Sequence, residues 1–116
     1  MEDLESLKQR LRQFADERDW DQFHSPKNLS MALIAEAGEL IEHFQWLTEE
    51  QSKKLDTKKL KEVSEELADI LIYLIRIADK LGVNLLEAAN NKIELNKIKY
   101  PADMVKGCSK KYSEYE

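Results

Sequence analysis

Hydrophobic residues recur along most of the chain at the three- and four-residue spacing of amphipathic α-helices. A first helix is predicted over about residues 4–19, where the apolar positions are Leu4, Leu7, Leu11 and Phe14. Ser25-Pro26 then signals a helix start, because serine caps free backbone amides and proline suits the first helical position. A second helix is therefore predicted from Pro26 to about residue 45. The aromatic stretch between the two helices has no helical period.

Two further long helices and a tail are predicted for the rest of the chain. The third helix covers about residues 57–81 and ends at Gly82, a residue type that readily adopts the left-handed C-cap conformation. The fourth begins near Asn84 and ends at Tyr100-Pro101. Between the second and third helices, the capping-box pattern of residues 48–51 predicts one short extra helix. Residues 102–116 have no period and are predicted to form a tail.

The predicted fold is all-α, a four-helix bundle-type domain over residues 1–101 followed by a tail over residues 102–116. Composition supports this class, because the 116 residues include sixteen Leu but only three Gly, two Pro, three Val and two Thr. Such a composition disfavours β-sandwiches, barrels and glycine-rich nucleotide loops. The length suits one domain with a modest core.

Charge and cysteine content indicate which partners and which cellular location to expect. The net charge is −5, which disfavours nucleic acid as a partner because phosphate binding requires a basic face. No apolar run approaches the ~18 residues of a membrane span, so no membrane association is expected. The acidic N-terminus does not resemble a signal peptide, and Cys108 is the single cysteine. A reducing, cytoplasmic location is the resulting expectation.

Two carboxylates of the second helix occupy unusual positions on the helical wheel. The apolar stripe of this helix consists of Leu29, Ala32, Leu33, Ala37, Leu40, Ile41 and Phe44. Glu36 falls inside the stripe and Glu39 at its edge. A buried, unpaired carboxylate costs several kcal/mol unless it is neutralised. A cationic partner is therefore expected.

The third helix is apolar over an unusually wide arc. Between Leu67 and Ala78 its apolar residues span roughly 220° of the wheel, against ~100° for an ordinary surface helix. The remaining polar strip carries Glu62, Glu66, Asp69, Tyr73 and Arg76. A helix of this kind must be covered on two sides, which one short chain can hardly achieve. Self-association around this helix is therefore predicted.

Two acidic pairs share one spacing, Glu36 with Glu39 and Glu66 with Asp69. The i, i+3 spacing places each pair on one helix face, and facing helices would bring all four carboxylates together. Hard oxygen ligands select Mg²⁺, Mn²⁺ or Ca²⁺ rather than zinc. Exposed acidic helix faces are the simpler alternative for either pair alone. The two pairs together, each embedded in apolar sequence, favour a metal site.

A di-iron carboxylate site is disfavoured, because neither histidine has a glutamate three residues before it. His43 lies one turn after Glu39 and is interpreted as a surface histidine paired with a carboxylate.

Several motifs in fixed order resemble the MazG-like nucleotide pyrophosphohydrolases, and within them the dCTP pyrophosphatase branch. These motifs are Trp20-Asp21-Gln22-Phe23-His24-x-Pro26-x-Asn28-Leu29, Glu36-x-x-Glu39, Phe44-Gln45-Trp46, Glu66-x-x-Asp69-Ile70-Leu71-Ile72-Tyr73-Leu74 and Lys92-x-x-x-Asn96-x-x-x-Tyr100-Pro101. The resemblance runs from about residue 14 to residue 112. The acidic signature alone is loose, whereas its combination with the aromatic motifs is specific.

The resemblance implies a fold, an activity and a set of site residues. It implies an Mg²⁺-dependent enzyme, with Mn²⁺ as a possible substitute, that releases pyrophosphate and a nucleoside monophosphate as a dimer or a dimer of dimers. The implied metal ligands are Glu36, Glu39, Glu66 and Asp69. The implied substrate contacts are Trp20, Asp21, Gln22, Phe23, His24, Trp46 and Tyr73. The branch also carries a substrate-contacting histidine nine residues before the tryptophan, and Leu11 stands there in this chain.

Hydrolysis of a nucleoside triphosphate is consistent with the predicted clustering of the acidic residues. A triphosphate cannot bind an acidic site directly, so Mg²⁺ must lie between the carboxylates and the phosphates. Glu39 is the predicted catalytic carboxylate that orients or deprotonates the attacking water. Trp20 and Trp46 flank the second helix at both ends and are predicted to sandwich a base by stacking, with a place in the core as the alternative. Lys92 and Asn96 share a helix face and are candidate phosphate or sugar contacts, although solvated helix residues would look the same.

The predicted function is therefore an Mg²⁺-dependent nucleoside triphosphate pyrophosphohydrolase, a nucleotide diphosphatase acting on dCTP or a modified pyrimidine nucleotide in pool sanitation. One alternative is a non-catalytic helical module whose apolar helix only mediates oligomerisation. Another is a hydrolase of the same fold that acts on dUTP or a phosphoribosyl-ATP-like nucleotide.

Overall fold

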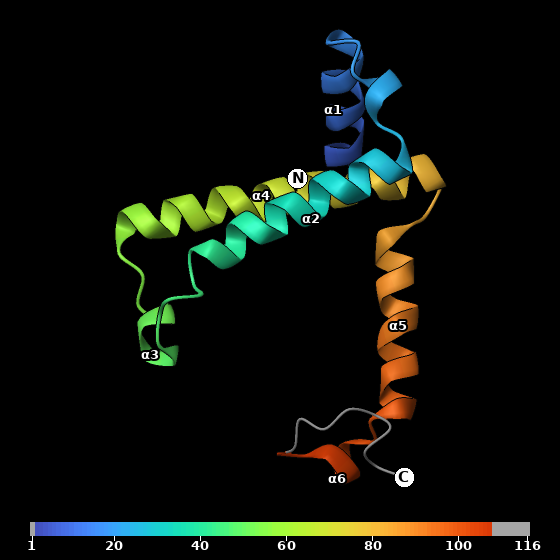
Figure 1. Cartoon of the computed structure of the whole chain (residues 1–116). Coiled ribbons are helices and arrows are strands. Elements are labelled where there is room, and N and C mark those ends of the chain that lie inside the picture. The colour runs from blue at the N-terminus through green and yellow to red at the C-terminus, as the bar shows by residue number, and fades with distance from the viewer. Residues whose placement is uncertain (1, 108–116) are drawn as a thin grey trace. The chain divides into compact units, whose positions relative to one another are not determined.

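The computed structural model describes residues 2–107, and every regular element in that part of the chain is a helix (Figure 1). The elements are α1 (Leu4–Glu17), η1 (Asp21–Phe23), α2 (Pro26–Glu42), α3 (Glu49–Ser52), α4 (Thr57–Leu81), α5 (Leu85–Lys99) and α6 (Ala102–Val105). The predicted all-α class is confirmed. None of the described helices combines the length and the apolar character needed to cross a membrane.

Local capping chemistry sets the helix boundaries. The Ser25 hydroxyl accepts a hydrogen bond from the backbone N–H of Asn28 at 3.1 Å, and Pro26 follows it at the first helical position. At the end of α4, Gly82 has φ +70°, a backbone conformation that residues with a side chain rarely adopt. The predicted capping box over residues 48–51 is present and opens α3. α1 and α2 end two and three residues earlier than predicted, as frayed helix ends commonly do.

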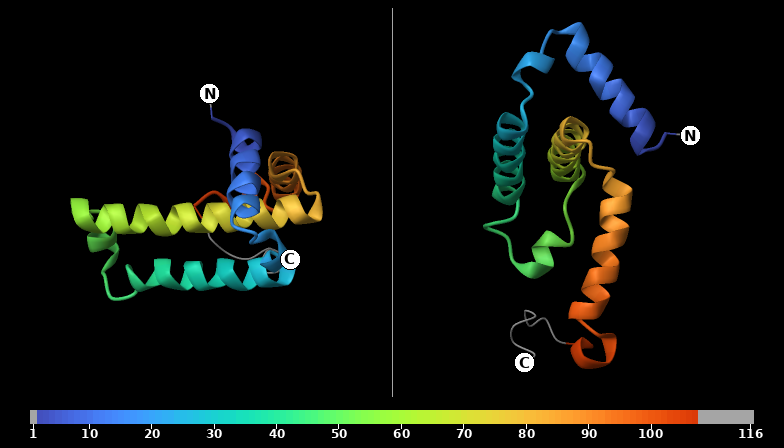
Figure 2. Two further views of the ribbon diagram at one scale, coloured as in Figure 1. Left: turned by 90° about the horizontal axis from the view of Figure 1, so that it is seen from above. Right: turned by 90° about the vertical axis from the view of Figure 1, so that its right-hand side faces the viewer.

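The chain divides into two compact units, Met1–Gly82 and Val83–Glu116. In the first unit α2 and α4 run antiparallel, side by side, and this is its main helix–helix contact (Figures 1 and 2). α1 crosses α4 near the end of α4 that leads to Gly82, and it contacts η1. The antiparallel pair thus places the middle of α2 opposite the middle of α4, where the predicted acids lie.

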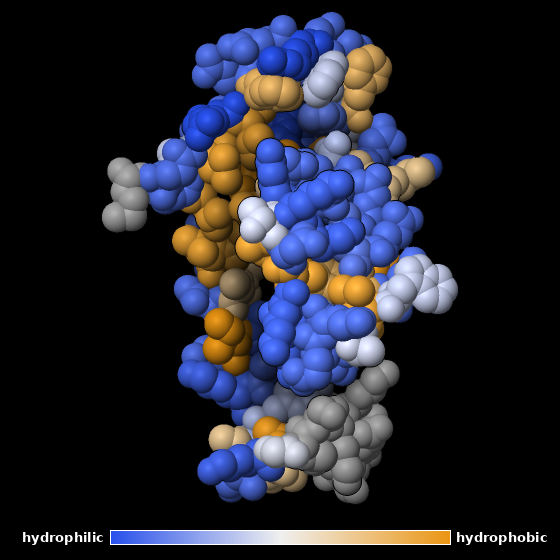
Figure 3. Space-filling model, turned by 90° about the vertical axis from the view of Figure 1, so that its left-hand side faces the viewer, coloured by the Kyte–Doolittle hydropathy of each residue, from blue (hydrophilic) through white to orange (hydrophobic). Residues whose placement is uncertain are grey.

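The buried core of the first unit is small, and it consists of Ala15, Leu29, Val63, Ile75 and Ala78. Many apolar side chains of α2 and α4 instead reach the surface. They include Met31, Ile34, Ile41, Leu60, Leu67, Leu71 and Leu74. Figure 3 shows apolar surface on one face of the molecule. Ile41 belongs to the predicted inward stripe but is 60% exposed, because α2 packs against one helix rather than two. The predicted self-association stays a prediction.

The second unit contains α5 and the short helix α6. α5 begins at the Asn84 cap, whose side chain accepts a hydrogen bond from the backbone N–H of Glu87 at 3.0 Å. The predicted tail is helical over Ala102–Val105, where the carbonyl of Pro101 accepts hydrogen bonds from two following amides. A single turn of this kind leaves no periodicity to detect. Cys108 lies outside the described residues, and the domain boundary at residues 101/102 stays a prediction.

Candidate functional site

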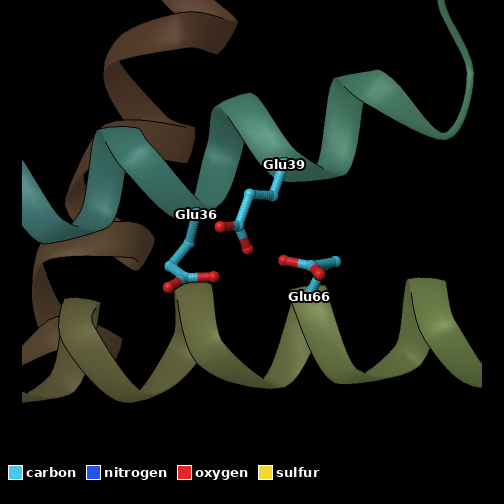
Figure 4. Close-up of side chains that lie close together, drawn as sticks. All are labelled: Glu36, Glu39 and Glu66. Atoms are coloured by element: carbon cyan, nitrogen blue, oxygen red, sulfur yellow. The ribbon is translucent and has the colours of Figure 1, made fainter.

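Three carboxylates converge between α2 and α4. Glu36 and Glu39 lie one turn apart on α2 and point toward Glu66 of α4 (Figure 4). One oxygen of each carboxylate lies within 4.8 Å of one oxygen of each of the other two. The i, i+3 spacing places the first two on one face, and the antiparallel packing supplies the third. We call Glu36, Glu39 and Glu66 the carboxylate cluster.

The carboxylate cluster brings like charges together in a partly buried position. Oε2 of Glu36 and Oε2 of Glu66 are buried and have no hydrogen-bond partner within residues 2–107. Burial, followed by the neighbouring Glu39 and by Asp69 and Glu66, raises the pKa of Glu36 from 4.5 to about 7. Burial and Glu39 also raise the pKa of Glu66. Burial and like charges therefore disfavour the ionised form of both carboxylates.

The donor set fits a hard divalent cation. Carboxylate oxygens are the ligands that Mg²⁺ and Mn²⁺ prefer, and the two orphaned oxygens are free to bind one. Asp69, predicted as the fourth ligand, is not part of the three-residue cluster. Its charge nevertheless contributes to the raised pKa of Glu36 and, after burial and Glu36, to the raised pKa of Tyr73. Asp69 therefore adds negative potential beside the cluster, and its role as a ligand stays a prediction.

His43 lies beside the cluster and contacts two carboxylates. Its Nε2 is 3.9 Å from Oε1 of Glu66, and its Nδ1 is 3.9 Å from Oε2 of Glu62. The Lys59 ammonium lies 3.2 Å from Nδ1. The predicted pairing of His43 with carboxylates is confirmed, although its side chain is only 17% exposed and is not a surface group. At 3.9 Å, His43 lies beyond hydrogen-bond distance of Glu66.

The aromatic segment, residues 20–24, precedes α2 and is folded against α1 and α4. The Trp20 ring packs edge-on against Phe14 at 5.7 Å between centroids and lies 6.5 Å from the His24 ring. Trp20 remains 45% exposed and Phe23 59% exposed, so both present aromatic surface to solvent. The Gln22 amide donates hydrogen bonds to the backbone carbonyl and the carboxylate of Asp19. Contact of these residues with a substrate stays a prediction.

Trp46 lies at the opposite end of α2 from Trp20. The helix between them has 17 residues and, at 1.5 Å per residue, is about 25 Å long. Trp46 is 86% exposed. Because of this separation, Trp20 and Trp46 of one chain do not stack on the two faces of the same base.

The chain is similar in sequence and in fold to known proteins. Residues 32–115 match the MazG-like family. The chain belongs to this family. It is 41% identical over 113 residues to dCTP pyrophosphatase 1 of Homo sapiens and to the same-named protein of Mus musculus. Each match covers 96% of this chain and 66% of the relative, so the chain spans about two thirds of the length of these relatives.

A solved structure of a pyrophosphatase has a similar fold. The crystal structure of a pyrophosphatase from Archaeoglobus fulgidus superimposes with a TM-score of 0.82 at 39% identity. The superposition covers 87% of this chain and 94% of that protein. The fold likeness therefore extends beyond the α2–α4 pair that carries the cluster.

Sequence reasoning missed an ion network at the other end of α4 in this MazG-like chain. Arg76 belongs to the predicted polar strip, yet it is only 3% exposed. Its Nη2 lies 3.0 Å from Oδ1 of Asp21, and its Nε lies 3.3 Å from Nδ1 of His24. Lys80 also binds Asp21, and Asp79 binds Arg12. No local pattern could reveal these contacts, since they join α4 to η1 and α1.

Lys92 and Asn96 lie on α5 in the second unit, where both are exposed. Their contact with phosphate or sugar stays a prediction. Leu11, at the position of the branch histidine, lies on α1 and is partly buried.

Proposed function

We propose that this chain hydrolyses a nucleoside triphosphate to a nucleoside monophosphate and pyrophosphate. The observation that carries the proposal is the carboxylate cluster, in which the buried oxygens of Glu36 and Glu66 have no partner among the described residues. A stable fold tolerates such a cluster if a divalent cation binds there in use. Membership of the MazG-like family and the names of the curated relatives support nucleotide chemistry at this site.

Mg²⁺ is the cation that we propose, with Mn²⁺ as a substitute. Glu36, Glu39 and Glu66 would hold it, with Asp69 as a further candidate ligand. When bound, it would supply charge neutralisation for the phosphates and acidify a water molecule. Glu39 is the most exposed member of the cluster, and we assign it the role of accepting the proton of the attacking water. Tyr73, half-buried near Glu36 and Asp69, would border the same site.

We propose a pyrimidine deoxynucleotide, dCTP or a modified relative, as the substrate. The exposed faces of Trp20 and Phe23 offer stacking surface for a base, and the relatives are named dCTP pyrophosphatase 1. The corresponding role would be removal of unwanted nucleotides from the cytoplasmic pool. Because Leu11 replaces the branch histidine, the preferred base could differ from cytosine. The nucleotide panel below therefore includes dUTP.

Self-association forms part of the proposal. Leu60, Leu67, Leu71 and Leu74 recur at helical spacing along α4 and are each 39–54% exposed. An uncovered apolar stripe of this length is typical of an interface. Light scattering coupled to gel filtration should give the mass of a dimer or tetramer, and Leu71→Glu should lower that mass. A monomeric wild-type chain would refute this part of the proposal and leave the metal site untouched.

A nucleotide panel tests the activity directly. Canonical and modified triphosphates are incubated with the protein and Mg²⁺, and pyrophosphate and phosphate are measured separately. We expect pyrophosphate and the monophosphate, with an ¹⁸O label from solvent water carried by the monophosphate. Release of single phosphate would reject the mechanism. An absence of product from every nucleotide, including dUTP and phosphoribosyl-ATP, would favour the non-catalytic interaction module.

A further inference from the structure

The buried guanidinium of Arg76 contacts the aromatic segment at two residues. Nη2 lies 3.0 Å from the Asp21 carboxylate, and Nε and Nη2 lie 3.3 Å and 3.2 Å from Nδ1 of His24. The side chain of Arg76 is only 4% exposed. Arg76 therefore connects the interior of the α1–α4 contact to the segment that we assign to base recognition.

Asp79 holds Arg76 from the opposite side. Its carboxylate, only 8% exposed, lies 3.7 Å from Nη1 of Arg76. The same carboxylate accepts two hydrogen bonds from Arg12 of α1, one from Nε at 2.7 Å and one from Nη2. Because Asp79 is fixed by α1, the guanidinium of Arg76 has a fixed position from which to contact η1.

This contact determines the protonation of His24. A guanidinium has only N–H donors, so the ring nitrogen that it contacts must accept and must carry no proton. The neutral ring then has its proton on Nε2, for which no acceptor exists within residues 2–107. Burial and the positive charges of Arg76 and Lys80 lower the pKa of His24, against the opposing effect of Asp21. The ring is therefore neutral near pH 7, with one unused donor.

We propose that Arg76 is a positioning residue that fixes His24 as the Nε2–H tautomer, so that the aromatic segment presents one hydrogen-bond donor to an acceptor atom of the nucleotide base. The proposal rests on the function proposed above and deepens it. The Trp20 ring lies 6.5 Å from the His24 ring, which places stacking surface and donor within the width of one base. The recognised chemistry is a base carbonyl oxygen or an unprotonated ring nitrogen.

Nitrogen NMR of the two imidazoles tests the tautomer without any substrate. The chain has only two histidines, so His43→Gln assigns the signals of His24. In the wild-type protein near pH 7 we expect His24 to be neutral, with Nε2 protonated and Nδ1 unprotonated. In Arg76→Gln we expect a raised His24 pKa and a mixture of tautomers. A protonated Nδ1 in the wild type, or an unchanged spectrum in Arg76→Gln, would overturn the proposal.

Kinetics separate base recognition from a structural role. Arg76→Gln should raise KM for the preferred pyrimidine triphosphate about tenfold and leave kcat within about twofold, because one base contact is lost. Hydrolysis of 2-deoxyribose 5-triphosphate, which has no base, should not change. Arg76→Lys keeps the charge but not the paired donors. Its KM should lie between that of the wild type and that of Arg76→Gln. Arg10→Gln is the matched control, because Arg10 is exposed and, among the described residues, pairs with Glu2 alone.

The outcomes distinguish this proposal from the activity proposed above. Equal losses on the nucleotide and on the base-free triphosphate would mean that Arg76 acts only on folding, and would refute the positioning role. A wild-type chain that hydrolyses no nucleotide would refute the proposed function even where the NMR gives the expected tautomer. A chain that hydrolyses nucleotides but has the Nδ1–H tautomer would refute this proposal alone.

Discussion

Two groups of charged side chains lie along the same helix, α4, and they differ in whether their buried charges are paired with opposite charges. Around Glu66, carboxylates from α2 and α4 face one another, and two of their buried oxygens have no partner among the described residues. Around Arg76, each carboxylate meets a cationic side chain, with Asp21 bound by Arg76 and Lys80 and Asp79 bound by Arg12. The carboxylates of the second group are compensated within the fold, whereas for the first group we propose a cation from solution.

The pKa values of the carboxylates express this difference. Burial and neighbouring acids raise the pKa of Glu36 to about 7. Hydrogen bonds from Arg12 lower the pKa of Asp79. The same chemical group is thus disfavoured as an anion in one region and favoured in the other. Partial burial of an acid does not by itself indicate function. The informative feature is a buried carboxylate oxygen that has no hydrogen-bond partner among residues 2–107.

The largest expected effect is the loss of activity when the carboxylate cluster is altered. Glu36→Gln or Glu66→Gln should lower kcat/KM for the preferred nucleotide by about 10³-fold, a typical loss when a key charge in an active site is removed. The helical circular dichroism should persist. Glu65→Gln, an exposed change on the same helix, is the matched control and should retain full activity. Full activity in the cluster variants would contradict the metal assignment.

Disruption of the ion network around Arg76 should lower the stability of the protein. Asp79→Asn removes the charge that binds Arg12 and leaves the buried Arg76 with one partner fewer, so it should lower the free energy of unfolding by about 2 kcal/mol. Urea unfolding followed by circular dichroism measures the change. A stability equal to that of wild type would mean that the network around Arg76 does not hold α1 and η1 to α4.

Mg²⁺ should stabilise the protein more at high pH than at low pH. At a concentration ten times its Kd, the ion should add about 1.4 kcal/mol to stability at pH 8. At pH 5.5 the gain should be smaller, because protons compete with the ion for carboxylates whose pKa values are raised. Thermal unfolding with Mg²⁺ or with a chelator gives the difference. A gain independent of pH would place the ion elsewhere.

The smallest expected effect is a gain in stability without metal. The pKa of Glu36 is about 7 when folded and near 4.5 when unfolded, so the folded state binds more protons between these values. The metal-free protein should therefore lose stability as pH rises from about 4.5 to about 7. Glu36→Gln should remove this loss and raise the melting temperature at pH 8 by on the order of 3 °C. A lower melting temperature would show that Glu36 is already compensated.

The helix ends of this structure can be predicted from the sequence, whereas most contacts between distant segments cannot. Helix starts such as Ser25-Pro26 and the end at Gly82 follow from capping chemistry within a few residues, and both are predicted correctly. The meeting of Glu36 with Glu66 is also predictable, because acids within apolar stripes must face each other when two helices pack. The burial of Arg76 is not, since it depends on how η1 and α1 fold back onto α4.

Exposure was harder to predict than element type. Ile41 belongs to a continuous apolar stripe, but its outward position depends on how many helices cover α2. Asp69 has the spacing of a fourth ligand, yet it is not among the three acids that converge, because the fit of its carboxylate depends on the exact apposition of α2 and α4. The turn at Ala102–Val105 is too short to show a period.

Binding of Mn²⁺ followed by electron paramagnetic resonance tests the central claim most directly, because free and bound ions give separable signals without any nucleotide. The wild-type chain and the Asp79→Asn variant should bind Mn²⁺ saturably, and Mg²⁺ should displace it. Glu36→Gln and Glu66→Gln should lose this binding. Equal Mn²⁺ affinity in the wild type and in both cluster variants would contradict the assignment of the metal site to the carboxylates between α2 and α4.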